Sequence, residues 1–251
     1  MEIFIRILKG LALGVVQGLT EFLPVSSSGH LLLIEKLGVA PPSLATNLFL
    51  HLATLLVVLI SMRKSVFNLV RHPFGERMIW ILIASIPTAA IGIIFKLFFE
   101  DLLVGKFLSV SFLITALLLL TARGTRFRPK RKLGAFLVGL AQGLAVLPGI
   151  SRSGTTISAM TFLNYEKEEA TELSFLMSIP VIIGGAIVEL KDLSFAEVDW
   201  IILSTAFLTA FLSGIFAIKV MLKNFHFART PFAIYLVIIS LLNTCIDVFK
   251  V

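Results

Sequence analysis

The chain has 251 residues, of which 57% are hydrophobic and 15% are charged, and its mean hydropathy is +0.99. Soluble domains carry about 25% charged residues, so this composition excludes an ordinary soluble protein and indicates an integral membrane protein. The net charge of +7 fits Lys and Arg gathered in cytoplasmic loops, so we expect membrane lipids, and no nucleic acid, as partners. The single cysteine, Cys245, supports no disulfide framework.

The apolar pattern predicts helices along the whole chain. In chain order they are 3–20, 27–36, 44–62, 78–98, 107–122, 133–147, 153–164, 172–190, 200–221 and 231–249. A helix needs about 20 residues to cross the hydrocarbon core, so 27–36 and 153–164 are too short to span. Each follows a helix that ends in turn-forming residues, which predicts two re-entrant helical hairpins and about six transmembrane helices. The first twenty residues are not expected to be a signal peptide, because a polar motif stands where cleavage would fall.

The charges of the loops orient these crossings. The loops after 44–62, 107–122 and 200–221 are rich in Lys and Arg, whereas acidic residues such as Glu100 and Asp192 occupy the alternate loops. Positive residues favour the cytoplasmic side of a membrane, so we expect the basic loops in the cytoplasm. Both termini are then predicted to lie outside.

The second half of the chain repeats the first at an offset of 125 residues. Identical pairs at this offset are Gly14 and Gly139, Gln17 and Gln142, Gly18 and Gly143, Leu19 and Leu144, Ser26 and Ser151, Ser28 and Ser153, and Gly29 and Gly154. Each half holds one hairpin and three crossings, an odd number, so the halves must have opposite orientations. We predict one membrane domain, residues 1–251, built as an inverted-topology repeat of about 1–125 and 126–251.

A first polar segment, residues 17–30, interrupts the apolar helices. Gln17 and Glu21 are four residues apart and share a helix face, while Ser26 or Ser27 shares a face of the next helix with His30. An ionisable residue at membrane depth is costly and is a functional candidate. The alternative is a buried hydrogen-bonded pair that only joins helices. The presence of His30 and three serines beside Glu21 favours a functional site.

A second polar segment, residues 148–156, surrounds Arg152 with Ser151, Ser153 and further hydroxyl residues at the expected start of a helix. Free backbone N–H groups and the helix dipole make such a start an anion site. The planar guanidinium of Arg152 adds a fork suited to phosphate oxygens. The alternative, an arginine that reaches up to the lipid headgroups, leaves the hydroxyl residues unexplained.

Together the two polar segments predict one phosphate-handling site. The absence of a Cys/His cluster in the sequence argues against zinc, whereas an oxygen-rich site with a carboxylate suits Mg²⁺ or Ca²⁺. In phosphoryl transfer the cation and Arg152 would neutralise charge and Ser27 or water would attack. His30 could then be base, acid or nucleophile. We interpret His51, alone on an apolar helix, as a packed histidine.

The two polar segments resemble the signatures of the undecaprenyl pyrophosphate phosphatase family, the bacitracin-resistance (BacA/UppP) type. The matching stretches are Gln17–His30 and Pro148–Thr156, and Ser174–Pro180 looks like a third family segment. The resemblance covers essentially the whole chain. It implies an enzyme that hydrolyses undecaprenyl pyrophosphate to the monophosphate and recycles the lipid carrier of cell-wall synthesis, using a divalent cation.

The resemblance also implies roles for single residues. Glu21 resembles the metal-associated carboxylate, and Ser27 and His30 resemble the catalytic pair, in which Glu21 also takes part. The family often has Glu where this chain has Gln17, so Gln17 is a candidate ligand through its carbonyl oxygen only. Arg152 resembles the phosphate clamp. The hydroxyl residues that we expect around the bound phosphate are Ser26, Ser151, Ser153 and Thr156.

The resemblance further implies a multi-pass protein of the bacterial cytoplasmic (inner) membrane, with a site that opens toward the outer face. The partner would be a polyprenyl diphosphate lipid, and the sequence leaves a monomer or a homodimer open. A flippase or transporter for the same carrier is the alternative function, because inverted repeats and an anion site also suit transport. A purely structural membrane scaffold would leave the paired polar segments without a reason.

Overall fold

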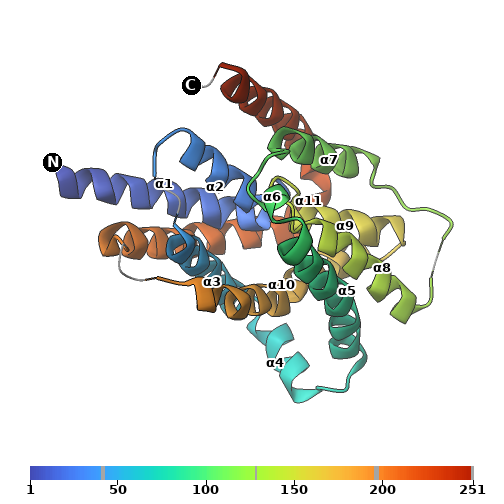
Figure 1. The fold of residues 1–251 in the computed structure, drawn as a ribbon. Coiled ribbons are helices and arrows are strands. Elements are labelled where there is room, and N and C mark those ends of the chain that lie inside the picture. The colour runs from blue at the N-terminus through green and yellow to red at the C-terminus, as the bar shows by residue number, and fades with distance from the viewer. Residues whose placement is uncertain (41–42, 128, 195–197, 250–251) are drawn as a thin grey trace.

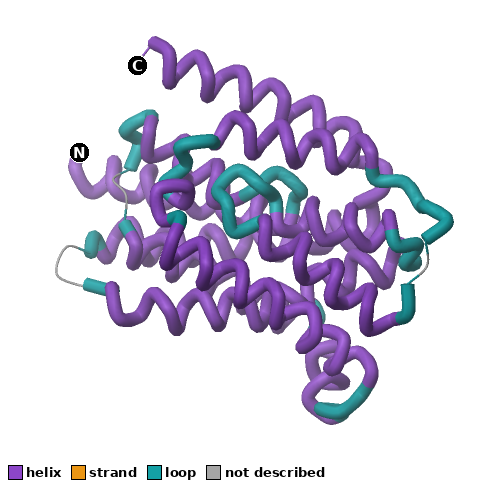
Figure 2. The backbone as a smooth tube through the Cα atoms, turned by 45° about the vertical axis from the view of Figure 1, so that its right-hand side comes forward, coloured by secondary structure: helices purple, strands orange, loops and turns teal. Residues whose placement is uncertain are grey.

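The structure is a computed structural model of residues 1–251, described here except for residues 41–42, 128, 195–197 and 250–251 and the side chains of 224–228. All the regular elements of the described residues are helices (Figure 2). They are α1 (Glu2–Phe22), α2 (Ser27–Lys36), α3 (Leu44–Ser61), α4 (Arg63–Arg71), α5 (Glu76–Phe98), α6 (Glu100–Leu103), α7 (Leu108–Thr121), α8 (Arg131–Leu144), α9 (Arg152–Phe162), α10 (Lys167–Glu189), the 3-10 turn η1 (Leu190–Asp192) and α11 (Trp200–Phe249).

Six helical stretches among the described residues are long and apolar enough to cross a membrane, which confirms the expected all-α polytopic fold. They are Glu2–Phe22, Leu44–Ser61, Glu76–Phe98, Lys167–Asp192, Trp200–Lys223 and Arg229–Phe249. The set differs from our prediction in one place. The first helix is long enough to span, although we expected it as half of a hairpin, whereas α7 has only 14 residues. Apolar side chains such as Ile86, 66% exposed, face outward where lipid would cover them.

Helix α11 is a single stretch of 50 residues, where we predicted two separate segments. Residues 222–230 contain neither Gly nor Pro, so nothing in this stretch interrupts the helical hydrogen bonds. At about 1.5 Å per residue the helix would measure about 75 Å, more than twice the hydrocarbon thickness of about 30 Å. Figure 1 shows how it fits: the orange first part and the red last part run in different directions.

Helix α4 and the short helix α6 are elements that our sequence analysis read as loops. Arg63, Lys64 and Arg71 made the α4 stretch too polar for a crossing helix, and we assigned it to a cytoplasmic loop. Nine residues of mixed character still form a helix here, because buried Leu69 packs one face of it into the core. The assignment of this stretch as a loop is therefore wrong.

The two halves of the chain exchange helices in packing. Helix α1 of the first half packs along α11 of the second, and α8 of the second half packs along α5 of the first. Small residues allow both contacts: an added Cβ at Gly14 would lie 2.4 Å from the carbonyl oxygen of Ala206, and one at Gly139 would lie 2.1 Å from that of Ala84. These glycines correspond at the offset of the repeat. The opposite membrane orientation of the halves stays a prediction.

The turns α1–α2 and α8–α9 are built alike and touch each other. Ser26 caps α2 by accepting a hydrogen bond from the Gly29 N–H at 3.3 Å, and Ser151 caps α9 by accepting one from the Gly154 N–H at 3.1 Å. The Gly149 N–H also donates to the Ser26 hydroxyl at 3.1 Å. This last bond joins the two polar segments directly, so the fold brings them to one place.

Candidate functional site

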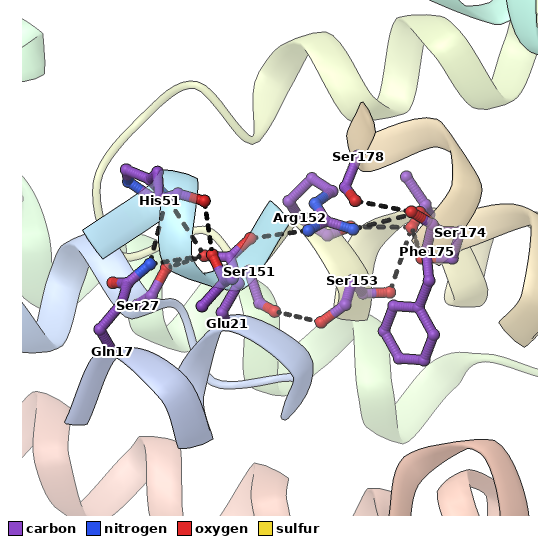
Figure 3. Close-up of polar contacts among 12 residues, drawn as sticks. Gln17, Glu21, Ser27, His51, Ser151, Arg152, Ser153, Ser174, Phe175 and Ser178 are labelled. Carbon is purple, nitrogen blue, oxygen red and sulfur yellow. Dashed lines mark hydrogen bonds and ion pairs between the residues drawn. The ribbon is translucent and has the colours of Figure 1, made fainter. Parts of the chain in front are cut away.

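Glu21 lies at the centre of the joined polar segments, on the last turn of α1 (Figure 3). One carboxylate oxygen, Oε1, accepts a hydrogen bond from Arg152 Nη2 at 2.7 Å, and the other, Oε2, accepts one from the Ser27 hydroxyl at 2.7 Å. Arg152 is the first residue of α9 and Ser27 the first of α2, so each sits at a helix start. A buried carboxylate needs such partners, because a lone charge at this depth would be strongly destabilising.

Arg152 also reaches α10 on its other side. Its Nη1 donates to the backbone carbonyl of Ser174 at 3.1 Å, and the Thr156 and Ser174 hydroxyls are 2.6 Å apart. The guanidinium is therefore fixed between the Glu21 carboxylate and the α10 backbone. Its fork holds a carboxylate where an anionic phosphate oxygen could bind in the same way.

His30 has partners on both ring nitrogens, and neither is Ser27. Nδ1 lies 2.7 Å from the backbone carbonyl oxygen of Ser26, and Nε2 lies 2.8 Å from the Tyr235 hydroxyl. Since a carbonyl only accepts, Nδ1 carries a proton, and in the neutral ring Nε2 accepts from Tyr235. The rings of His30 and Tyr235 stack at 5.7 Å. In this arrangement no hydrogen bond joins the expected pair, Ser27 and His30.

The hydroxyl residues that we expected around phosphate are present at the site and are 4% exposed or less. Ser26 and Ser151 use their hydroxyls as helix caps, and Ser153 donates to the carbonyl oxygen of Leu23 at 3.3 Å. Thr156 donates to the carbonyl oxygen of Arg152 at 2.9 Å. These bonds give the four residues a role in holding the two turns together. Their contact with phosphate stays a prediction.

His51 belongs to the site, and our interpretation of it as a packed histidine is wrong. Its Nδ1 lies 3.1 Å from Gln17 Nε2 and 3.5 Å from Glu21 Oε2. The packing of α3 beside α1 brings it there. The reasoning that singled out Glu21, an ionisable side chain on an apolar helix, applied equally to His51 and could have found it. Tyr235 was missed for a different reason, because a lone phenol on an apolar helix carries no such signal.

The residues around Glu21 fit a divalent cation in one respect that can be tested on the structure. Gln17 is fully buried, and its carbonyl oxygen, Oε1, has no hydrogen-bond partner. Together with the Glu21 carboxylate it offers oxygen atoms of the kind that Mg²⁺ and Ca²⁺ take, with further ligands supplied by substrate phosphates. Among the described residues no group of three His, Cys, Asp or Glu side chains surrounds one point.

The chain matches the family model for the bacitracin resistance protein BacA over residues 10–242. It belongs to this family. The chain is 43% identical to the undecaprenyl-diphosphatase of Carboxydothermus hydrogenoformans, over 86% of this chain and 87% of that protein. It is 38% identical to the one from Halothermothrix orenii, over 96% of this chain and 97% of that protein. It is 41% identical to the one from Methanococcus maripaludis strain C6, over 85% and 90%.

The BacA match includes both polar segments and also His51 and Tyr235. The residues that contact Glu21 and His30 therefore all lie within the part of the chain that defines the family. The recognition of this family from the two polar segments is confirmed.

Proposed function

We propose that this protein is a multi-pass membrane enzyme that hydrolyses undecaprenyl pyrophosphate to undecaprenyl phosphate and inorganic phosphate. It thereby recycles the lipid carrier of cell-wall synthesis. The observation that carries the proposal is the Glu21 carboxylate held by both Arg152 and Ser27 where the two turns meet. Membership of the BacA family and the names of its relatives support the phosphatase. They give no support to a carrier flippase.

The residues divide the work of phosphoryl transfer. Arg152 binds and neutralises the diphosphate, and the helix starts at Ser27 and Arg152 add partial positive charge. Glu21 accepts a proton from the group hydrogen-bonded to it, which is Ser27 in the structure. The bond that breaks joins the terminal phosphorus to the bridging oxygen, and undecaprenyl phosphate leaves. If water attacks, inorganic phosphate forms at once; if Ser27 or His30 attacks, water must release it from the protein.

His30 contributes its Nε2, the nitrogen that faces the Tyr235 hydroxyl. In the neutral ring this nitrogen can accept a proton, and the bond from Nδ1 to the Ser26 carbonyl keeps the ring oriented. Rotation of the ring or movement of α2 on substrate binding would be needed to bring it to Ser27. The structure thus favours Glu21 over His30 as the partner of the Ser27 hydroxyl.

We propose that Glu21 and Gln17 Oε1 hold a divalent cation, Mg²⁺ or Ca²⁺. When bound, the cation would neutralise charge on the diphosphate oxygens. The isoprenoid would lie along the apolar helices, with the diphosphate at the two turns. We further propose two re-entrant hairpins in an inverted repeat, both termini outside the cytoplasmic membrane, and a site open to the outer face. The alternation of basic and acidic loops supports this orientation.

Phosphate release from undecaprenyl diphosphate by the purified protein in detergent tests the function. With Mg²⁺ or Ca²⁺ we expect turnover by the wild type and a large loss in Arg152→Ala and His30→Ala. Absence of phosphate release by a folded wild type would overturn the enzyme. Full activity of both variants would leave the reaction standing but place it elsewhere in the molecule.

A further inference from the structure

Three side chains from two helices converge at the second oxygen of Glu21, the one that does not face Arg152 (Figure 3). Gln17 Nε2 lies 3.2 Å from Glu21 Oε2 and 3.1 Å from His51 Nδ1, and His51 Nδ1 lies 3.5 Å from Glu21 Oε2. The three atoms form a nearly equilateral triangle. Gln17 and Glu21 come from α1 and His51 from α3.

Hydrogen bonds alone satisfy this triangle poorly. With Gln17 Nε2 donating to both neighbours, its own Oε1 is left buried without a partner, and the lone pair of His51 Nδ1 faces the Glu21 carboxylate. If Nδ1 instead carries the proton, the proton meets the Gln17 Nε2–H donor. Each assignment therefore leaves one side of the triangle with two donors or two acceptors in contact.

A cation removes this conflict. Half a turn of the Gln17 amide exchanges Oε1 and Nε2, and three acceptors, two oxygens and one nitrogen, then face one another. The separations of 3.1, 3.2 and 3.5 Å suit neighbouring ligands of one ion. Metal–ligand bonds of about 2.1–2.4 Å at right angles place adjacent ligands about 3.0–3.4 Å apart.

We propose that His51 is a metal ligand that completes a cation site with Glu21 and Gln17, and that its imidazole nitrogen makes this site prefer Mn²⁺ to Ca²⁺. The inference rests on the proposed phosphatase and deepens its metal requirement. Imidazole suits first-row transition metals, whereas Ca²⁺ takes oxygen ligands. Gln17 supplies the third ligand, and Glu21 serves Arg152 with one oxygen and the cation with the other.

Pulsed electron paramagnetic resonance on the wild type with Mn²⁺ alone tests the coordination without relying on a variant. In detergent, with isotope-labelled histidine, we expect the nitrogen coupling of a directly bound imidazole. His51→Gln should abolish this coupling and weaken Mn²⁺ binding roughly tenfold or more, since outer contacts of metal sites alone change affinity by about 10–100-fold. His72→Gln is the matched control, because His72 is exposed and lies beyond α4. It should change neither.

A second variant measures selectivity instead of loss. His51→Asp keeps a ligand but replaces nitrogen by oxygen, and we expect the ratio of the Kd values for Ca²⁺ and Mn²⁺ to fall about tenfold. A purely structural role of His51 would leave this ratio unchanged. Bound Mn²⁺ without histidine coupling in the wild type, or coupling that persists in His51→Gln, would overturn the proposal.

The phosphate-release assay keeps this proposal apart from the function on which it rests. An active phosphatase that shows no histidine coupling disproves the role of His51 alone. Histidine-coupled Mn²⁺ in a protein that releases no phosphate disproves the phosphatase and leaves the metal site established.

Discussion

At the scale of single residues, the carboxylate of Glu21 presents one oxygen to Arg152 and the other to Ser27, Gln17 and His51. The guanidinium of Arg152 in turn spans from Glu21 to the Ser174 carbonyl. Two nitrogens of one planar group are thus used in two directions. A Lys ammonium on a flexible stem could reach only one of these partners at a time.

Arg152→Lys should therefore keep the charge and lose the geometry. We expect kcat/KM for phosphate release to fall about 100-fold, the scale of one lost transition-state donor, with little loss of protein stability. The measurement is steady-state kinetics beside thermal unfolding in detergent. Arg126→Lys, in the exposed loop before α8, is the control and should leave both unchanged. Wild-type kinetics in Arg152→Lys would show that the fork is not used.

Tyr235→Phe removes the hydroxyl that faces His30 Nε2 and keeps the stacked ring. We expect kcat to fall about tenfold with KM nearly unchanged, because His30 would lose its orientation but Arg152 would still bind phosphate. The loss of stability should be about 1 kcal/mol, as for one hydrogen bond.

The only other tyrosine in the chain supplies the control for this prediction. Tyr165 accepts a hydrogen bond from Trp80 Nε1 at 2.9 Å, and Tyr165→Phe should cost similar stability without changing kcat. Equal kinetic effects of the two variants would mean that Tyr235 acts only through stability.

Most of the site could be predicted at this scale, because Glu21, Ser27, Arg152 and the hydroxyl residues sit in two short stretches with local turn chemistry. The sequence did not reveal which of them pair. His51 meets Glu21 only because α3 packs beside α1, and Tyr235 meets His30 across 205 residues of chain. Such pairings depend on tertiary packing, which no periodicity within one helix reports.

At the scale of elements, the contact between α1 and α11 depends on glycines. An added Cβ at Gly18 would lie 2.1 Å from the Ser213 hydroxyl and 2.4 Å from the Ala210 carbonyl oxygen, so these helices touch backbone to backbone. The offset identities Gly14, Gly18, Gly139 and Gly143 were visible in the sequence, but their partner helices were not. The continuity of α11 was equally hidden, because two apolar runs joined by a polar stretch read as two helices and a loop.

Gly14→Ala tests the close contact of these two helices. We expect a loss of about 1–3 kcal/mol, since the methyl group meets backbone atoms of α11 that cannot move aside. Gly92→Ala in α5 is matched to it: nothing lies within 4 Å of its added Cβ, so better helix propensity should stabilise the protein slightly. Opposite shifts of the unfolding temperature in detergent are expected. Equal shifts would contradict the tight contact.

At the scale of the whole molecule, each half contributes one turn to the site and lends a helix to the other half. The pair α1 and α11 and the pair α8 and α5 are equivalent under the sequence offset. This exchange makes it impossible for either half to form its packing alone. The sequence predicted the repeat from seven identities, and the reciprocal packing could be seen only in the structure.

The predicted orientation in the membrane can be tested by labelling introduced cysteines in intact cells. In a Cys245→Ser background, Asp101→Cys should react with a membrane-impermeant maleimide, because its loop is expected outside. Arg126→Cys should react only after the cells are opened. Both positions are exposed in the structure, so protection would report the membrane and not burial. Labelling of both or of neither in intact cells would contradict the topology.

The bond between Arg152 and Glu21 makes the resting pocket its own competitive inhibitor. Any anion that seeks the guanidinium must first displace a carboxylate tethered 2.7 Å away, whose effective concentration is on the order of millimolar or higher. Free inorganic phosphate has only its own charge with which to win that contest, whereas a lipid diphosphate adds the burial of its isoprenoid chain. The ion pair would then expel the small product while admitting the substrate, and hydrolysis would run in one direction without a gate.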